Sequence, residues 1–140
     1  MGDIVEYING LPGLCKSGGV DEKLIDQAEK ELGLKFAQDY RDYTKAFGRI
    51  SVFGVELTGV VDNKNQDVRK MTLFEREYNN LIPDDMYVIE ETGMESLIYL
   101  QNRLGTVFSS IGHSPPKPVF SSLIDYLEEQ KRLWFLYWAR

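Results

Sequence analysis

The hydrophobic spacing changes type several times along this chain, and the order of these changes constrains the fold more than any other feature. Apolar residues recur at helical spacing in segments 20–33 and 38–47, and β-branched residues interrupted by glycine follow in 50–61. The remaining predicted elements are a helix over 67–79, strands over 86–91, 96–101 and 106–111, and a last helix from about residue 120. Helices and strands that are grouped along the chain are typical of the α+β class.

Each predicted helix has one apolar face, which we expect to be buried. These faces are Leu24, Ile25, Ala28 and Leu32 in the first helix, Tyr40, Tyr43 and Phe47 in the second, and Val68, Met71, Phe74 and Tyr78 in the third. Asp21 and Gly33 are residue types that begin and end a helix. The segment LWFLYW, residues 133–138, is apolar nearly all round, and we expect burial between elements rather than a contact surface to explain it.

The stretch FGRISVFGVELTG, residues 47–59, contains three glycines and raises the question of a phosphate-binding loop. Such a loop needs a GK[ST] ending before a helix, or GxGxxG between a strand and a helix. Neither pattern is present here. We therefore expect these glycines to mark a bulge or a close approach of two backbones.

The segment GHSPPKP, residues 112–118, is predicted to be a loop that cannot continue a strand, because its prolines lack the amide donors of a ladder. It contains His113, the only histidine, which we interpret as a solvated loop residue. One histidine and one cysteine, Cys15, give a weak basis for a zinc site or a catalytic triad. We predict no catalytic residues, no metal site and no cofactor.

Length and charge narrow the class of protein. A chain of 140 residues is predicted to form one domain over 1–140, and its net charge of -6 argues against direct nucleic-acid binding. The start, MGDIVEYI, lacks the pattern of a signal peptide, and no apolar run is long enough to cross a membrane. With a single cysteine, the sequence predicts a cytoplasmic protein without a membrane partner.

The acidic residues are unevenly distributed, because the segment from Glu77 to Asn102 contains no Lys or Arg. If the strands in this segment are neighbours, their end loops would gather the carboxylates into one negative patch that steers a basic protein partner. A surface that only confers solubility is the open alternative. The predicted partner-binding residues are Asp84, Asp85, Tyr87, Glu90, Glu91 and Glu95, with Tyr87 as an aromatic anchor.

Two blocks of the sequence resemble the SMI1/KNR4 family, also called the SUKH superfamily. The first block, residues 25–59, resembles the family pattern of a helix ending in "E..LG", then "LP.DY..F", then a glycine-rich turn into "FFG..L.G", with Ala37 in place of the usual Pro. The matching positions are Glu29, Leu32, Gly33, Phe36, Asp39, Tyr40, Phe47, Gly48, Phe53, Gly54, Leu57 and Gly59. The second block, residues 81–108, is similar to the family's hairpin region, and the resemblance spans about 21–128.

This resemblance implies a single domain with a mixed or antiparallel sheet of about five or six strands packed by helices. It also implies that the protein binds a partner and does not catalyse a reaction. Bacterial members of the family are typically immunity proteins that neutralise secreted toxins, many of them nucleases, by direct contact. Two alternatives stay open: a regulatory interaction module, as in the fungal branch of the family, and a small hydrolase that uses a carboxylate pair such as Glu90–Glu91.

Overall fold

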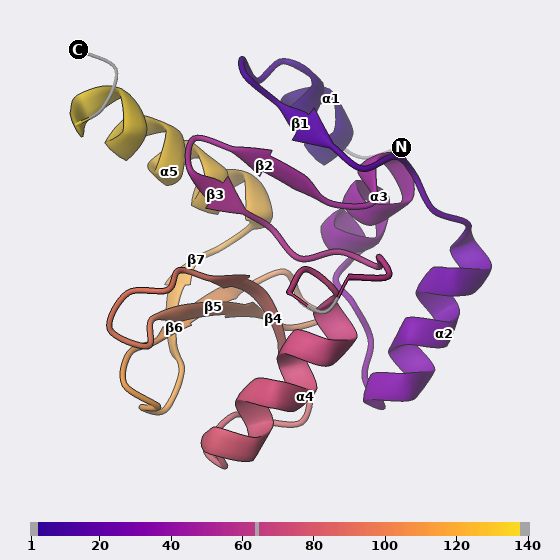
Figure 1. Ribbon diagram of the computed structural model, residues 1–140, viewed down its shortest axis with the longest axis vertical. Helices are drawn as coiled ribbons and strands as arrows, with labels where there is room; N and C mark the ends of the chain where they lie inside the picture. The colour runs from indigo at the N-terminus through magenta and orange to yellow at the C-terminus, as the bar shows by residue number, and fades with distance from the viewer. Residues whose placement is uncertain (1–2, 64, 138–140) are drawn as a thin grey trace.

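Two antiparallel sheets form the framework of the protein in the computed structural model, which describes residues 3–63 and 65–137 (Figure 1). The smaller sheet has the order β1-β2-β3, with β1 Cys15–Lys16, β2 Ile50–Val52 and β3 Val55–Glu56. The larger sheet has the order β4-β5-β6-β7, with β4 Tyr87–Glu91, β5 Ile98–Gln101, β6 Val107–Ser110 and β7 Lys117–Phe120. The predicted α+β fold is confirmed, although the strands form two antiparallel sheets rather than one.

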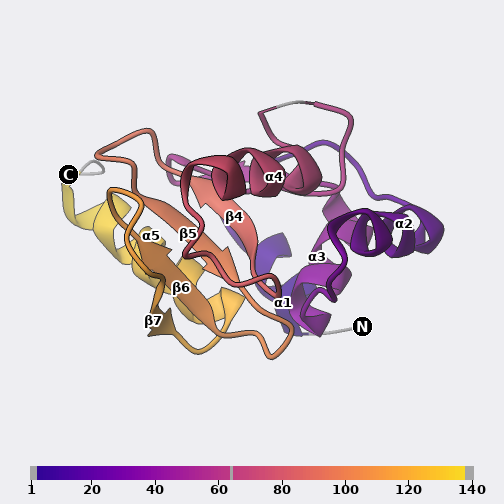
Figure 2. The ribbon, with the colours of Figure 1, turned by 90° about the horizontal axis from the view of Figure 1, so that it is seen from below.

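Helices cover both faces of the larger sheet (Figure 2). The helices are α1 Asp3–Asn9, α2 Glu22–Leu32, α3 Gln38–Phe47, α4 Val68–Tyr78 and α5 Leu123–Tyr137. α4 lies on one face, where Met71 packs with Val88, Ile98 and Leu100 in a small hydrophobic cluster. α1, α3 and α5 pack with the opposite face in a larger cluster. Within the described part of the chain, no helix has the length and apolar character that a membrane crossing requires.

The centre of the larger cluster is aromatic. The ring of Phe36 lies 5.1 Å from that of Tyr40 and 4.8 Å from that of Tyr87. The Tyr87 hydroxyl donates to Gln101 Oε1 at 2.7 Å and accepts from the Ala37 amide at 2.9 Å. Because this buried hydroxyl has both a donor and an acceptor partner, its hydrogen bonds offset the cost of desolvation and hold α3 against the sheet.

The ends of α2 agree with the sequence interpretation. Asp21 accepts a hydrogen bond from the Lys23 amide at 2.8 Å, and Gly33 closes the helix in the left-handed conformation with φ of 68°. Ile25 is fully buried, as predicted. The prediction was wrong for Leu24, which is 52% exposed because it lies at the edge of the buried stripe.

α4 is rotated about its axis relative to the prediction. Phe74 and Tyr78, which were expected to be buried, are 51% and 59% exposed. Thr72 and Glu75 point inward instead. The Thr72 hydroxyl accepts the Val88 amide at 2.9 Å, so a polar contact to β4 fixes the orientation of the helix. Apolar spacing alone does not reveal such a contact.

The prediction that segment 112–118 cannot contribute to a strand was wrong at its end. Lys117 and Pro118 begin β7, which pairs with β6. β7 is the last strand in the order β4-β5-β6-β7 and therefore lies at an edge of the sheet. A proline that lacks an amide donor is tolerated in such a position.

The glycine-rich stretch has the structural role that the sequence predicted. Gly54, with φ of 75°, lies in the turn between β2 and β3. A Cβ atom at Gly59 would overlap the carbonyl oxygen of Gly48, so the two backbones approach each other more closely than any side chain allows.

The apolar end of α5 is only partly buried. Trp134 packs against Gly54, and the ring of Phe135 lies 5.8 Å from that of Phe53. Phe135, Leu136 and Tyr137 are nevertheless 41% to 65% exposed, so the expected burial was wrong for these three residues. Trp138, the last residue of LWFLYW, lies outside the described residues.

Candidate functional site

The structure separates the predicted acidic residues into groups. Asp84 and Asp85 precede β4, whereas Glu91 ends that strand and Glu95 lies in the loop after it. A five-residue strand spans about 16 Å. The carboxylates therefore lie at opposite ends of β4 and do not form the single patch that the sequence predicted.

Tyr87 and Glu90 are buried, and this corrects their proposed contact with a partner. Tyr87 is fully buried in the aromatic centre, where its hydroxyl is already satisfied. Glu90 is 6% exposed and accepts a hydrogen bond from the Tyr126 hydroxyl of α5. Neither side chain can reach a partner unless the core opens.

Glu90 and Glu91 lie on opposite faces of β4 because side chains alternate along a strand, and a β-bulge decides which face each residue takes. The pairing of β4 with β5 shifts register between Val88 and Glu90, which adds one residue to β4. Glu90 consequently lies on the side of the sheet that α5 covers, beside Tyr126. Glu91 lies on the side that α4 covers, beside Glu75. The two side chains do not converge, so the Glu90–Glu91 pair cannot provide the paired carboxylates of a hydrolase.

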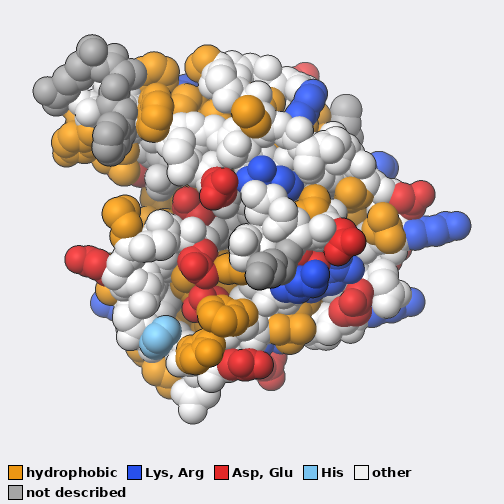
Figure 3. Space-filling view, in the orientation of Figure 1, with side chains coloured by type: hydrophobic (Ala, Val, Ile, Leu, Met, Phe, Trp, Pro, Cys, Tyr) orange, Lys and Arg blue, Asp and Glu red, His pale blue; other side chains and the backbone are white. Residues whose placement is uncertain are grey.

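A pocket beside α4 is lined by carboxyl, aromatic and imidazole side chains that the sequence interpretation did not place together. It has a volume of about 330 Å³, and we call it the α4 pocket. Its walls include Phe74, Glu75, Tyr78, Glu91, Ile98 and His113. Figure 3 shows hydrophobic, acidic and histidine side chains gathered on this face of the molecule, over α4 and the neighbouring strands.

Two carboxyl groups meet in the α4 pocket. Glu75 is 7% exposed, and burial raises its pKa to about 7, with further contributions from the hydrogen bond and the charge of Glu91. Two carboxylates that share one small site do not both ionise readily. Near neutral pH a fraction of the molecules therefore carries a proton on Glu75.

An aromatic wall borders the carboxyl groups. The rings of Phe74 and Tyr78 lie 5.0 Å apart, one helical turn from each other on α4. The imidazole of His113 stacks on the ring of Tyr78, with 6.4 Å between the ring centres and an angle of 22° between the ring planes. His113 is exposed on its loop, as predicted, but its contact with Tyr78 was not predicted from the sequence. The spacing of Phe74 and Tyr78 did place both on one helix face.

A second hollow adjoins the α4 pocket and shares two of its residues, Phe74 and Glu91. It has a volume of about 540 Å³ and is also lined by Glu56, Asn65, Lys70 and Met71. Lys70 lies 3.8 Å from Asp62, so its charge has a partner on the surface. The two hollows together form a continuous concave surface, which we call the α4 face.

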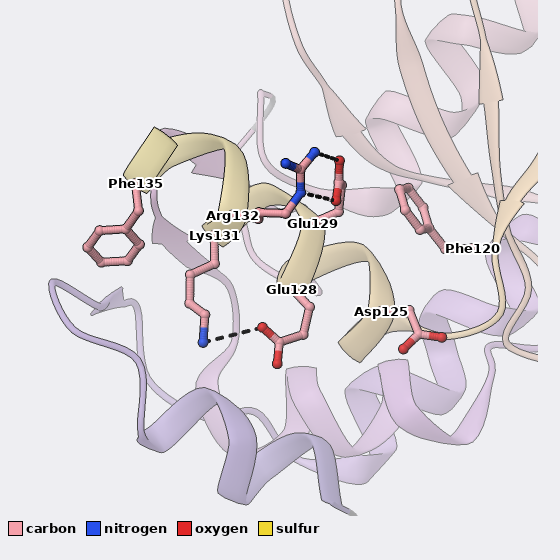
Figure 4. A pocket seen from close by; sticks show the side chains of 7 residues that line it. All are labelled: Phe120, Asp125, Glu128, Glu129, Lys131, Arg132 and Phe135. Carbon is pink, nitrogen blue, oxygen red and sulfur yellow. Dashed lines mark hydrogen bonds and ion pairs between the residues drawn. The ribbon is translucent and has the colours of Figure 1, made fainter. Parts of the chain in front are cut away.

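The hollow along α5, shown in Figure 4, is the main alternative site. Its charges are paired within the helix: Lys131 lies 3.3 Å from Glu128, and Arg132 makes two hydrogen bonds to Glu129 at 2.8 and 2.9 Å. The hydrogen bonds from Arg132 lower the pKa of Glu129. Because these charges satisfy one another, this hollow offers less attraction to a charged partner than the α4 pocket.

Metal chemistry receives no support from the described residues. Within 3–63 and 65–137, no three His, Cys, Asp or Glu side chains are grouped so that they could hold a metal ion. Cys15 is exposed on β1. The converging groups of the α4 pocket are two carboxyls, aromatic rings and one imidazole.

The comparison with protein families agrees with the architecture described above. A family model named SUKH_5, described as SMI1-KNR4 cell-wall, matches residues 1–134. A search of the curated proteins finds no match. Because the family match extends over nearly the whole sequence, the chain belongs to the SMI1-KNR4 family.

Proposed function

We propose that this protein is a non-enzymatic immunity protein, which binds a cognate toxin, a basic nuclease, and neutralises it by direct contact. Membership of the SMI1-KNR4 family supports this proposal, because bacterial proteins of the SUKH superfamily typically have this role. The observation that carries the proposal is the α4 face, where the half-exposed rings of Phe74 and Tyr78 border the carboxyl groups of Glu75 and Glu91.

Such a surface suits a protein partner for two physical reasons. Phe74 and Tyr78 are rigid aromatic side chains that are half exposed, and aromatic anchors of this kind contribute strongly to protein interfaces. The net charge of -6 favours encounter with a basic protein and increases the rate of association. Both features serve binding, and neither requires a bond to be made or broken.

The predicted acidic residues that remain exposed have a secondary role in this proposal. Glu91 lines the α4 pocket and contacts the partner directly. Glu95, in the loop that follows β4, and Asp84 and Asp85, at the opposite end of that strand, contribute to the long-range attraction of a basic toxin. Removing one of these three charges is expected to change the association rate more than the dissociation rate.

Co-expression with the toxin encoded next to this gene tests the proposal. We expect the wild-type protein to restore growth and to co-purify with the toxin, because binding blocks the toxin directly. The double variant Phe74→Ala/Tyr78→Ala should lose both effects. Leu104→Ala, which truncates a residue that is 76% exposed on the turn between β5 and β6, is the matched control and should behave as wild type.

Full toxicity in the presence of the folded wild-type protein, together with no co-purification, would contradict the proposal. If the wild-type protein and both variants protect equally, direct neutralisation stands but the α4 face is not the binding surface. A genomic neighbourhood without a toxin gene would instead favour the regulatory interaction module.

A further inference from the structure

We propose that the α4 pocket binds an arginine side chain of the protein partner. The inference rests on the proposed function for the existence of that partner, but it can be tested without the toxin. The residues proposed to bind the guanidinium group are Glu75, Glu91, Phe74 and Tyr78. No local sequence pattern had indicated that they form one site.

The carboxyl groups provide the first argument. Only 7% of the surface of Glu75 is exposed, and its carboxyl group faces another carboxyl group, that of Glu91. None of the described residues that line this pocket is a Lys or an Arg. A buried carboxylate that faces a like charge is unfavourable, and an arriving cation would relieve that repulsion and satisfy both groups.

The aromatic rings provide the second argument, and they select a flat cation. A guanidinium group stacks on aromatic faces and can donate parallel hydrogen bonds to a carboxylate, whereas an ammonium group is a compact, strongly hydrated charge. Phe74 and Tyr78 line the same pocket as Glu75, and their rings are 5.0 Å apart. The pocket therefore combines the two surfaces that arginine uses.

The size of the pocket agrees with a single side chain. Its volume of about 330 Å³ lies at the lower end of the range of roughly 300–1,000 Å³ that small-molecule sites occupy. It is also open on one side, where Phe74 and Tyr78 reach solvent. A side chain that projects from a partner surface can enter from this direction.

The pH dependence of binding follows from the groups that face the pocket. These groups are Glu75 and Tyr78 of α4, Glu91 of β4 and His113 of the loop before β7. Burial and the neighbouring Glu91 raise the pKa of Glu75 to about 7, so Glu75 is ionised at pH 8 and can accept hydrogen bonds from the guanidinium, whereas at pH 5 it holds a proton. This loss of charge weakens arginine binding as the pH falls.

An NMR titration with N-acetyl-arginine amide at pH 8 tests the inference. We expect amide shifts in α4, at the end of β4 and around His113, and no such shifts with the neutral analogue N-acetyl-citrulline amide. The double variant Glu75→Gln/Glu91→Gln keeps the shape of the pocket and should bind the arginine probe at least about tenfold more weakly. Asp3→Asn/Glu6→Gln removes two exposed acids of α1, outside the pocket, and should bind as wild type.

Two results would overturn the inference. One is the absence of shifts in the wild-type protein, and the other is equal binding by wild type and Glu75→Gln/Glu91→Gln, with both spectra showing a folded protein. Because the probe is not the toxin, these results leave the proposed function intact. A toxin that does not bind the wild-type protein would contradict the proposed function while the arginine site could still be demonstrated.

Discussion

At the scale of single residues, Glu90 is the side chain whose environment differs most from its sequence interpretation. It is buried between β4 and α5, close to Tyr126, Tyr99 and Glu56. Burial raises its pKa to about 7, and the negative charge of Glu56 adds to that shift. An exposed acidic residue on this strand could contact a partner protein, whereas the buried Glu90 contacts only other residues of the core.

The raised pKa of Glu90 predicts a stability that falls as the pH rises. The folded protein holds a proton on Glu90 up to about pH 7, whereas the unfolded chain releases it near pH 4.5, so the stabilisation is present at low pH and lost between these values. We expect Glu90 to lower the free energy of unfolding by on the order of 2–3 kcal/mol between pH 5 and pH 8.

Glu90→Gln, which keeps an acceptor for the Tyr126 hydroxyl, should remove that part of the pH dependence. Urea denaturation of the variant and the wild type at pH 5, 6.5 and 8 measures the effect. Glu75, whose pKa is also raised, keeps its own contribution in this variant. Glu95→Gln, on the exposed loop, is the control and should show the same change of unfolding free energy with pH as the wild type. If Glu90→Gln also shows the wild-type pH dependence, Glu90 is not the source of it.

Gly59 is a second residue whose identity is set by its surroundings. An alanine Cβ there would overlap the Gly48 carbonyl oxygen, which is backbone and cannot move aside easily. Gly59→Ala should therefore lower the free energy of unfolding by about 2–4 kcal/mol. Gly10→Ala, where the nearest atom would be 3.6 Å away, is the matched control for thermal or urea denaturation and should change stability by less than about 1 kcal/mol.

At the scale of elements, α4 is the helix that defines the site, and its orientation was not predictable from apolar spacing. Val68 and Met71 did mark the buried side, but Thr72 and Glu75 complete it. The hydrogen bond from the Val88 amide to Thr72 joins residues 16 positions apart. Nothing in the spacing of α4 itself indicates that contact.

The observed orientation of α4 makes a prediction about stability. Phe74→Ser and Tyr78→Ser remove half-exposed rings and should each change the free energy of unfolding by less than about 1 kcal/mol. Met71→Ala, three residues earlier on the same helix, truncates a side chain that is 8% exposed and should cost about 2–4 kcal/mol. Urea denaturation distinguishes the two cases, and large losses for both serines would show that this face of α4 is buried.

The elements that could be predicted are those with strong local signals. Asp21 and Gly33 marked both ends of α2, and the strands predicted over 96–101 and 106–111 correspond to β5 and β6. Contacts distant in sequence could not be anticipated. Asp39, for example, accepts the Leu123 amide at the start of α5, 84 residues away, and also the Gln101 side chain. Such contacts decide which acidic residues belong to the fold and which to the surface.

At the scale of the whole molecule, the family resemblance gave the fold, while the location of the site required the structure. Charge composition predicted a negative surface, but β4 divides the acidic residues between its two ends, and the bulge sends Glu90 into the core. The candidate site instead combines one predicted residue, Glu91, with Glu75, Phe74, Tyr78 and His113. Their meeting depends on the packing of α4 on the sheet.

The central claim is that the α4 face binds a protein toxin, and isothermal titration calorimetry with the purified toxin domain encoded beside this gene tests it most directly. We predict saturable 1:1 binding by the wild-type protein and by Leu104→Ala, and a loss of affinity of at least about 100-fold in Phe74→Ala/Tyr78→Ala, as expected for two aromatic anchors. Equal affinities for all three proteins, or no binding by the folded wild type, would contradict the claim.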